Sequence, residues 1–232
     1  MTAVSADAPA RDIAYGEVKS WILMGEIPLG MRLAEARVAA RLAMSRTPVR
    51  EALLRLSAER FVERDANGGY RVKHLTARAV RELYDVRTAL ELFAIRHTVA
   101  HPAQAGAALA ELRTEWLAVE PEPPDSDPNF VILDEDFHER LAGASGNAEL
   151  VEALRRACER IRPVRTHDFV IPGRIEVTIA EHVEILEAAI EGRPGAAGLL
   201  ERHIGASQRL AEAAVGRALE RMLTTSEADL GW

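Results

Sequence analysis

Residues Ser45–Leu56 have the sequence SRTPVREALLRL, and this stretch decides the fold of the first part of the chain. Ser45 is a favourable N-cap because its hydroxyl can accept a hydrogen bond from a free amide of the first turn. Pro48 is tolerated in that turn, where its missing N–H would have no partner anyway. Apolar side chains recur at i, i+3, i+4 and i+7, which predicts one buried face formed by Val49, Ala52, Leu53 and Leu56. Arg46 and Arg50 lie four residues apart on another face, so a helix with cationic side chains near its N-terminus is predicted.

Short elements on both sides of this helix predict a winged helix-turn-helix. Residues 35–42 form a predicted helix that ends in a tight turn at residues 43–44, and residues 18–23 form an earlier one. Residues 61–64 and 70–73 are predicted strands joined by the turn-forming sequence DANGG. Arginines on a single amphipathic helix are usually only solvated, but this order of elements places a second helix in a DNA groove beside a hairpin wing.

Three motifs in this region carry a family resemblance: GEIPLGMRL (25–33), LAMSRTPVREAL (42–53) and GYRV (69–72). Through them residues 13–73 resemble the winged helix of GntR-family bacterial transcription regulators. The resemblance implies that DNA contacts come from Ser45, Arg46, Thr47 and Arg50, and that Gly69 allows the wing to approach the DNA backbone. Members often carry Arg followed by Glu where this chain has Ala36 and Arg37, so Arg37 is added as a displaced DNA contact.

The net charge of −7 is divided unevenly along the 232 residues. Residues 1–75 carry 12 Lys and Arg against 9 Asp and Glu, a net charge of +3, whereas residues 76–232 carry 17 against 27, a net charge of −10. The positive charge therefore accompanies the predicted helix-turn-helix and marks a local DNA footprint. The acidic remainder disfavours nonspecific coating of DNA.

The single cysteine, Cys158, allows neither an intrachain disulfide nor a thiolate metal cluster and is typical of a reducing cytoplasm. Residues 1–10 have no basic and apolar leader pattern, and no apolar run approaches the roughly 18 residues that a membrane helix needs. We therefore expect a cytoplasmic protein with no membrane association.

The fold class predicted for the whole chain is mainly α: a winged helix-turn-helix with a small β-hairpin, followed by an all-helical bundle of six to seven helices. The first bundle helix is expected to run from the N-cap Thr76 to about residue 100. Its predicted buried side chains are Val80, Leu83, Tyr84, Val86, Leu90 and Phe93. Further helices are predicted at 107–119, 129–143, 147–162, 174–191 and 195–223, with a break near Pro163. The predicted parts are a flexible tail (1–12), the DNA-binding domain (13–74), the helical domain (75–223) and a C-terminal tail (224–232).

Three histidines and an aspartate are candidate metal ligands in the helical domain. Asp134 and His138 share one helix face, and His182 and His203 lie on two later helices that a tight turn makes antiparallel. This donor set suits a divalent cation such as zinc, nickel or manganese. From spacing alone, a surface hydrogen bond between Asp134 and His138 and ordinary hydrogen-bonded histidines remain the alternatives.

Four motifs extend the resemblance to the rest of the chain: LYDVRTALE (83–91), DEDFHERL (134–141), ASGN (144–147) and EH (181–182). Through them residues 76 to about 220 resemble the FCD effector domain of the FadR subfamily of GntR regulators. The resemblance implies a metal site formed by Asp134, His138, His182 and His203, with zinc expected first and nickel or manganese as alternatives. It also implies a cavity in which the metal and Arg87 bind a small organic acid. A plain salt bridge from Arg87 to Glu91 or Asp85 is the alternative role of this arginine.

The function predicted from these features is that of a sequence-specific DNA-binding transcriptional regulator and not of an enzyme. We expect a repressor that binds a palindromic operator as a homodimer and whose DNA affinity a small carboxylate effector controls. The alternative from another class is a metal-dependent hydrolase or isomerase with a DNA-binding appendage. Against it, the sequence has neither a His-Glu-x-x-His run nor a nucleophile–base pair. An architectural DNA binder without an effector is a third possibility, which the four candidate ligands disfavour.

Overall fold

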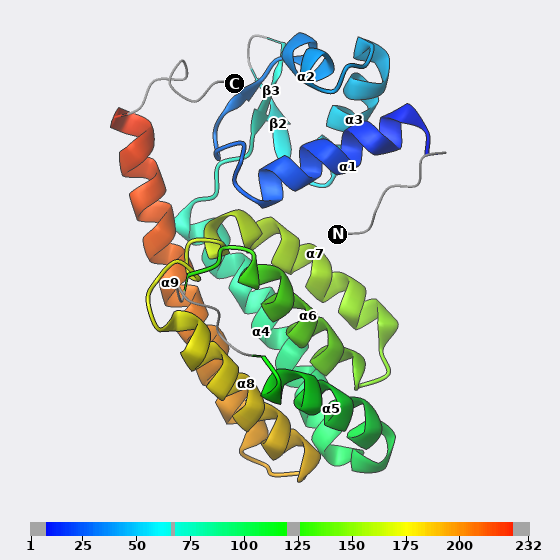
Figure 1. Cartoon of the computed structure of the whole chain (residues 1–232), viewed down its shortest axis with the longest axis vertical. Coiled ribbons are helices and arrows are strands. Elements are labelled where there is room, and N and C mark those ends of the chain that lie inside the picture. The colour runs from blue at the N-terminus through cyan, green and yellow to red at the C-terminus, as the bar shows by residue number, and fades with distance from the viewer. Residues whose placement is uncertain (1–7, 66–67, 120–125, 225–232) are drawn as a thin grey trace. The chain divides into compact units, whose positions relative to one another are not determined.

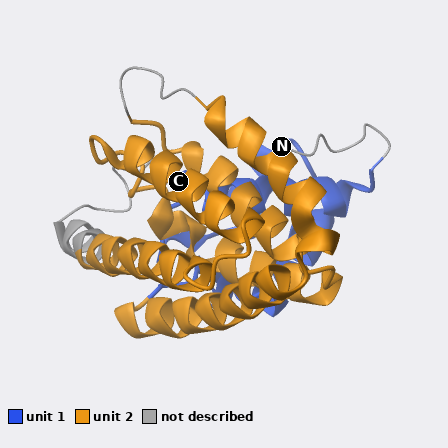
Figure 2. Ribbon diagram, turned by 90° about the horizontal axis from the view of Figure 1, so that it is seen from below, with its two compact units in different colours: residues 1–75, 217–232 blue, residues 76–216 orange. Residues whose placement is uncertain are grey.

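A computed structural model describes residues 8–65, 68–119 and 126–224, with side chains described as far as residue 216 (Figure 1). The chain divides into two compact units, residues 1–75 with 217–232 and residues 76–216 (Figure 2). The prediction of a flexible tail at residues 1–12 is wrong for residues 10–12, because the first helix begins at Ala10. The remaining tail predictions fall mostly on residues 1–7 and 225–232, which lie outside the described residues.

The first unit holds three helices and a small antiparallel sheet. The helices are α1 (Ala10–Leu23), α2 (Glu35–Arg41) and α3 (Arg46–Ala58), and the strands are β1 (Arg32–Leu33), β2 (Val62–Arg64) and β3 (Tyr70–Val72). The strand order is β1-β3-β2, with Arg32 opposite Arg71 and Val62 opposite Val72. The predicted hairpin is thus confirmed, but β1 was not predicted because two residues are too few to show alternation.

Helix α3 buries the face that its apolar spacing predicts, formed by Val49, Ala52, Leu53 and Leu56. Pro48 lies in its first turn, as expected. The predicted capping bond of Ser45 is wrong: Ser45 is the N-cap residue, but its side chain makes no capping hydrogen bond. Its hydroxyl is therefore not needed to start the helix. The tight turn before α3 has Ala43 at a positive φ of 51°.

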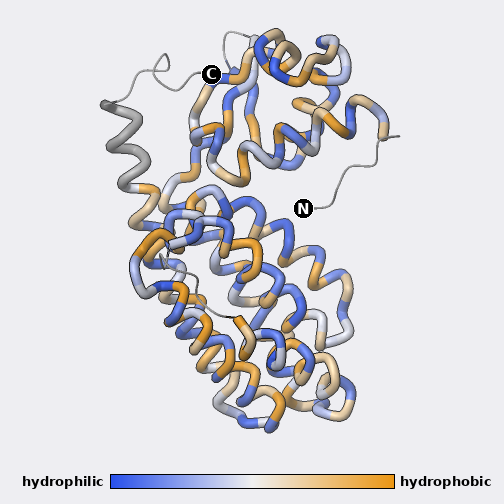
Figure 3. The backbone as a smooth tube through the Cα atoms, in the orientation of Figure 1, coloured by the Kyte–Doolittle hydropathy of each residue, from blue (hydrophilic) through white to orange (hydrophobic). Residues whose placement is uncertain are grey.

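The second unit consists of helices, and its described residues contain no strand. These helices are α4 (Ala77–Ala100), α5 (Pro102–Leu117), α6 (Phe130–Gly143), α7 (Ala148–Arg165), α8 (Arg174–Ile190) and α9 (Ala196–Thr224), of which residues 217–224 are assigned to the first unit. The predicted cap of α4 is confirmed, since Thr76 Oγ1 accepts a hydrogen bond from the Ala79 amide at 3.1 Å. Helix α6 packs on α7 and α4, and α5 packs on α8. Apolar residues are interspersed with polar ones along the helices (Figure 3), and none of the described helices is long and apolar enough to cross a membrane.

Three sequence predictions for this unit are corrected by the structure, and the first two corrections bear on the candidate site. The buried face of α4 contains Arg87 and Glu91, whereas Val86 and Phe93, predicted to be buried, are 48% and 56% exposed. Helix α7 does not end near Pro163 but continues through it to Arg165. A proline so close to a helix C-terminus removes one amide hydrogen bond without ending the helix. The start of α5 at Pro102 is also five residues earlier than predicted.

Candidate metal centre and DNA-binding surface

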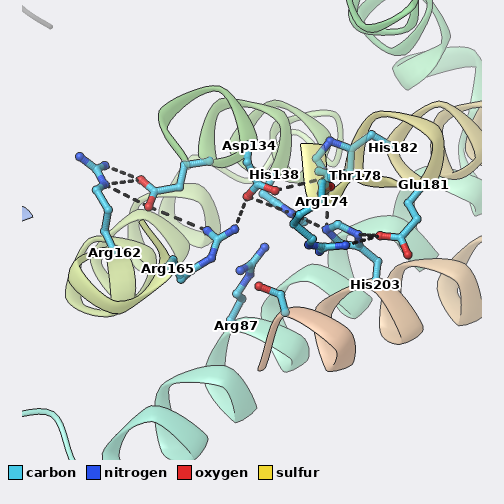
Figure 4. A network of polar contacts seen from close by, with 12 residues as sticks. Arg87, Asp134, His138, Arg162, Arg165, Arg174, Thr178, Glu181, His182 and His203 are labelled. Atoms are coloured by element: carbon cyan, nitrogen blue, oxygen red, sulfur yellow. Dashed lines mark hydrogen bonds and ion pairs between the residues drawn. The ribbon is translucent and has the colours of Figure 1, made fainter. Parts of the chain in front are cut away.

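The four candidate metal ligands come together in the interior of the second unit. Asp134 and His138 project from α6, His182 from α8 and His203 from α9 (Figure 4). One donor atom from each lies within 4.8 Å of the others, and all four side chains are buried. Helices distant in the sequence therefore supply one compact set of metal-binding atoms.

The imidazole nitrogens converge on a common centre. The Nε2 atom of His203 lies 3.2 Å from Nε2 of His182 and 3.3 Å from Nε2 of His138. The carboxylate of Asp134 completes the group, with Oδ2 3.6 Å from Nε2 of His138 and Oδ1 3.7 Å from Nε2 of His182. Three imidazole nitrogens and one carboxylate group thus face each other at short range.

Two carboxylates orient two of these rings by accepting hydrogen bonds from Nδ1, the nitrogen that faces away from the centre. His138 Nδ1 donates to Glu91 Oε2 at 2.5 Å, and His203 Nδ1 donates to Glu181 Oε2 at 2.7 Å. When Nδ1 holds the ring proton, Nε2 presents its lone pair to the centre. Two lone pairs cannot hydrogen-bond to each other, so nitrogens this close suit a shared cation. The residues present therefore fit a divalent metal ion.

Burial keeps two of the imidazoles, those of His138 and His182, in the neutral form that metal ligation requires. Burial, followed by the positive charge of Arg87, lowers the pKa of His138 to about 4. Burial and the neighbouring His203 lower the pKa of His182 well below its ordinary value. Burial alone would raise the pKa of Asp134, but the charge of Arg165 beside it keeps that pKa well below its usual range. The centre therefore contains two neutral imidazoles, those of His138 and His182, and one anionic carboxylate.

Two buried arginines lie beside this centre. Arg87 Nε donates to Glu91 Oε1 at 2.7 Å. Arg165 Nη2 donates to Asp134 Oδ2 at 2.5 Å (Figure 4). Nη1 and Nη2 of Arg87 and Nε of Arg165 have no hydrogen-bond partner among the described residues. The salt bridge to Glu91 that was the alternative role of Arg87 is present, yet it uses only one edge of the guanidinium group. Buried donors without partners are costly, so these atoms fit an anionic ligand.

Three residues of this network were not predicted as part of the site: Glu91, Arg165 and Glu181. The spacing of Glu91 four residues after Arg87 was a usable signal for the buried pair. Glu181 precedes His182 directly, but its carboxylate bonds to His203 on the next helix, which spacing within one helix cannot show. Arg165 was missed because Pro163 was interpreted as a helix end.

The predicted DNA contacts lie at the surface of the first unit. Ser45, Arg46, Thr47 and Arg50 are exposed at the start of α3, and Arg37 is exposed on α2. The guanidinium group of Arg50 pairs with the carboxylate of Glu35 at 2.9 Å. These side chains form a cationic edge where the two helices of the motif meet.

Gly69 is half-buried at the base of the wing. A Cβ there would meet Arg32 Nε and the Leu33 carbonyl oxygen at 3.7 Å, an ordinary van der Waals contact. The positive φ of the turn falls instead on Gly68, at 85°. Nothing within the described chain requires glycine at position 69.

Comparison with known families gives two matches along the chain. Residues 11–72 match the family described as bacterial regulatory proteins, gntR family, and residues 82–206 match the FCD domain. The first match covers the helix-turn-helix and wing. The second covers helices α5 to α8 together with the four clustered ligand residues.

Individual relatives are also transcriptional regulators. The Nta operon transcriptional regulator of Aminobacter aminovorans is 39% identical over 119 residues, and this match spans 51% of the chain and 56% of that protein. The uncharacterized HTH-type transcriptional regulator YdhC of Bacillus subtilis is 27% identical over 173 residues, or 75% of the chain and 77% of that protein. A GntR regulator of Rhodococcus sp. RHA1 has a solved structure with a TM-score of 0.65 and 24% identity, covering 88% of this chain and 98% of the other. The similarity to the Rhodococcus structure is a similarity of fold.

Proposed function

Because the chain belongs to the GntR family of bacterial regulatory proteins and carries an FCD domain, it is a DNA-binding transcriptional regulator, and we propose how it works. Residues 13–74 bind a palindromic operator as one half of a homodimer. Residues 75–223 bind a divalent metal ion and a small carboxylate effector. The effector lowers the DNA affinity of a repressor that acts in the cytoplasm, where bacterial DNA lies.

The observation that carries the metal proposal is the convergence of four donor atoms, with two of the imidazoles oriented by carboxylates. Asp134, His138, His182 and His203 would hold the ion, and this donor set favours zinc, with nickel or manganese as alternatives. Such an ion supplies a Lewis-acidic centre that attracts an anionic group. Because its ligands come from α6, α8 and α9, it would also tie these three helices together.

The unpartnered arginine donors support the effector proposal. Arg87 and Arg165 are buried, lie next to the candidate metal ligands and keep N–H groups without partners among the described residues. A small carboxylate can accept hydrogen bonds from such a guanidinium group in two parallel contacts. Its binding would shift the protein toward a state with lower DNA affinity, which requires that the two states bind it differently.

The DNA proposal rests on the exposed start of α3. Arg46 and Arg50 are the main candidates for reading bases, with Ser45, Thr47 and Arg37 nearby and Gly69 in the wing. One recognition helix reads only a few base pairs, so a second copy is needed for a specific site. A palindromic operator follows from the two-fold symmetry of such a dimer.

The contacts of the acidic residues around the centre favour regulation over the hydrolase or isomerase alternative. Glu91 and Glu181 bond to imidazoles, and Glu135 pairs with Arg162 Nε at 2.9 and 3.0 Å. None of these three carboxylates is placed as an unpaired general base. The relatives of the chain are also regulators.

The test of the DNA proposal is a double substitution, Arg46→Ala with Arg50→Ala. The double variant should lose the specific gel shift on the DNA upstream of its own gene, while circular dichroism remains helical because both side chains are exposed. Specific binding that survives both substitutions would refute the assignment of these arginines.

A further inference from the structure

We propose that Glu35 determines DNA sequence specificity by fixing the orientation of Arg50, so that one edge of the guanidinium group is held and the other faces a base. The proposal rests on the proposed function, in which Arg50 contacts DNA. It gives a positioning role to a negatively charged residue on the surface that approaches a polyanion.

The contact between the two side chains is bidentate. Arg50 Nε lies 3.1 and 3.2 Å from the two carboxylate oxygens of Glu35, and Nη2 lies 2.9 Å from Oε2. Glu35 is the first residue of α2 and Arg50 belongs to the second turn of α3. The pair therefore links the two helices of the helix-turn-helix and ties the arginine to a neighbouring rigid element.

The contact leaves the outer edge of Arg50 available. A guanidinium group has five N–H donors, and Glu35 occupies the side formed by Nε and Nη2. Both hydrogens of Nη1 and the second hydrogen of Nη2 remain. One hydrogen of Nη1 and that of Nη2 form the fork that matches O6 and N7 of guanine in the major groove. The Arg50 side chain is 63% exposed and that of Glu35 only 22%, so the arginine is the outer partner.

The negative charge of Glu35 also has an effect on DNA affinity, which is opposite to its effect on specificity. The hydrogen bond from Arg50 lowers the pKa of Glu35, and the nearby charges of Arg46 and Arg64 act in the same direction. An ionised carboxylate at this position repels DNA phosphates and weakens binding to any sequence. A fixed arginine, in contrast, loses less side-chain entropy when it meets its base. Glu35 is therefore expected to lower general affinity and to raise discrimination.

The experiment begins with duplexes selected by the full-length wild-type protein from a randomised library. Fluorescence anisotropy then measures binding to the selected duplex, to each of its single base-pair changes and to an unrelated duplex. Arg50→Ala identifies the base pair that Arg50 reads. At that base pair, Glu35→Ala and Glu35→Gln should each reduce discrimination at least fivefold, while binding to the unrelated duplex stays equal or becomes tighter.

Glu26→Gln is the matched control. It also removes one negative charge from an arginine pair of the same unit, that of Glu26 with Arg41 at 3.5 Å. Its discrimination should remain within twofold of the wild type, and circular dichroism should confirm that each variant is folded.

Two results would overturn the proposal in different ways. If Arg50→Ala loses discrimination but both Glu35 variants keep it, Glu35 has no positioning role and the proposed function stands. If Arg50→Ala keeps full discrimination at every base pair, or the wild type selects no common sequence, the assignment of Arg50 to DNA fails and this proposal fails with it.

Discussion

Glu91 joins the two halves of the buried network, because one of its oxygens accepts from Arg87 and the other from His138. Replacing it with alanine leaves the buried charge of Arg87 without a partner. Breaking a buried ion pair in this way costs about 3–5 kcal/mol. We therefore predict that Glu91→Ala lowers the free energy of unfolding by that amount in urea denaturation of the metal-chelated protein.

Helix α4 offers a control with identical spacing. Glu82 pairs with Arg78 four residues before it, as Glu91 does with Arg87, but both side chains of this pair are exposed. Glu82→Ala should leave the urea midpoint unchanged within error. A similar loss in both variants would show that burial of the Arg87–Glu91 pair is not the cause.

The pKa of His138 predicts a pH dependence of stability. In the folded chain this pKa is about 4, below the ordinary value of 6.5, so between these values only the unfolded chain binds the proton. Stability is therefore complete above about pH 6.5 and falls toward pH 4, by on the order of 3 kcal/mol for this residue. The pKa of Glu91, about 2, adds a loss in the same direction between about pH 4.5 and 2.

Urea midpoints of the metal-chelated protein at pH 7.5, 6 and 5 measure this dependence. The midpoint should decrease as the pH falls, and His138→Gln should make the decrease shallower. The same substitution at the exposed His101 provides the comparison. A midpoint that rises on acidification would contradict the account.

The four candidate ligands could be predicted from the sequence because metal-binding side chains are chemically distinctive and two of them share a helix face. The residues that orient them could not. Arg87 and Glu91 lie on the same buried face of α4 as Leu83 and Tyr84, but hydrophobicity alone predicts that charged side chains are exposed. Phe93, which it predicts to be buried, is exposed. A buried ion pair satisfies its own polar groups, so its position depends on tertiary contacts that one helix does not reveal.

The N-cap residues of α7 and α3 differ in whether their side chains make a capping hydrogen bond. Asn147 caps α7, since its side chain accepts a hydrogen bond from the Leu150 amide at 3.0 Å, whereas Ser45 makes no such bond at α3. We predict that Asn147→Ala lowers the free energy of unfolding by about 1 kcal/mol. Ser45→Ala should leave it unchanged while weakening DNA binding. Equal destabilisation by both substitutions, measured by urea denaturation, would contradict this difference.

Long, strongly patterned elements were predictable, and those that depend on partners were not. The buried stripe of α3 appears in its apolar spacing, but the stripe of α1 begins with the small Ala14, which adds little to any hydrophobic pattern. Strand β1 exists because it pairs with β3, a contact between residues far apart in the sequence. Helix α7 passes Pro163, and the residues that follow bring Arg165 to Asp134.

On the scale of the whole molecule, the chain combines a basic first part with an acidic second part, +3 for residues 1–75 and −10 for residues 76–232. The family matches divide along similar lines, at residues 11–72 and 82–206. DNA attraction is therefore confined to one part of the chain, and the part that holds the candidate metal centre carries net negative charge.

A metal held by ligands from three helices should stabilise the second unit. Any ion that binds only the folded state raises stability, by about 2.7 kcal/mol at a free concentration of 100 times Kd. The thermal midpoint of chelated protein should therefore rise as zinc is added. In the His182→Ala, His203→Ala double variant it should stay constant, and an equal rise there would place the stabilising ion elsewhere.

The most direct test of the central claim is elemental analysis of protein purified without a histidine tag. The account predicts one divalent metal ion per chain in the wild type and a clear loss of that metal in the His182→Ala, His203→Ala variant. Equal metal content in the two proteins would contradict the assignment of Asp134, His138, His182 and His203 as the metal centre.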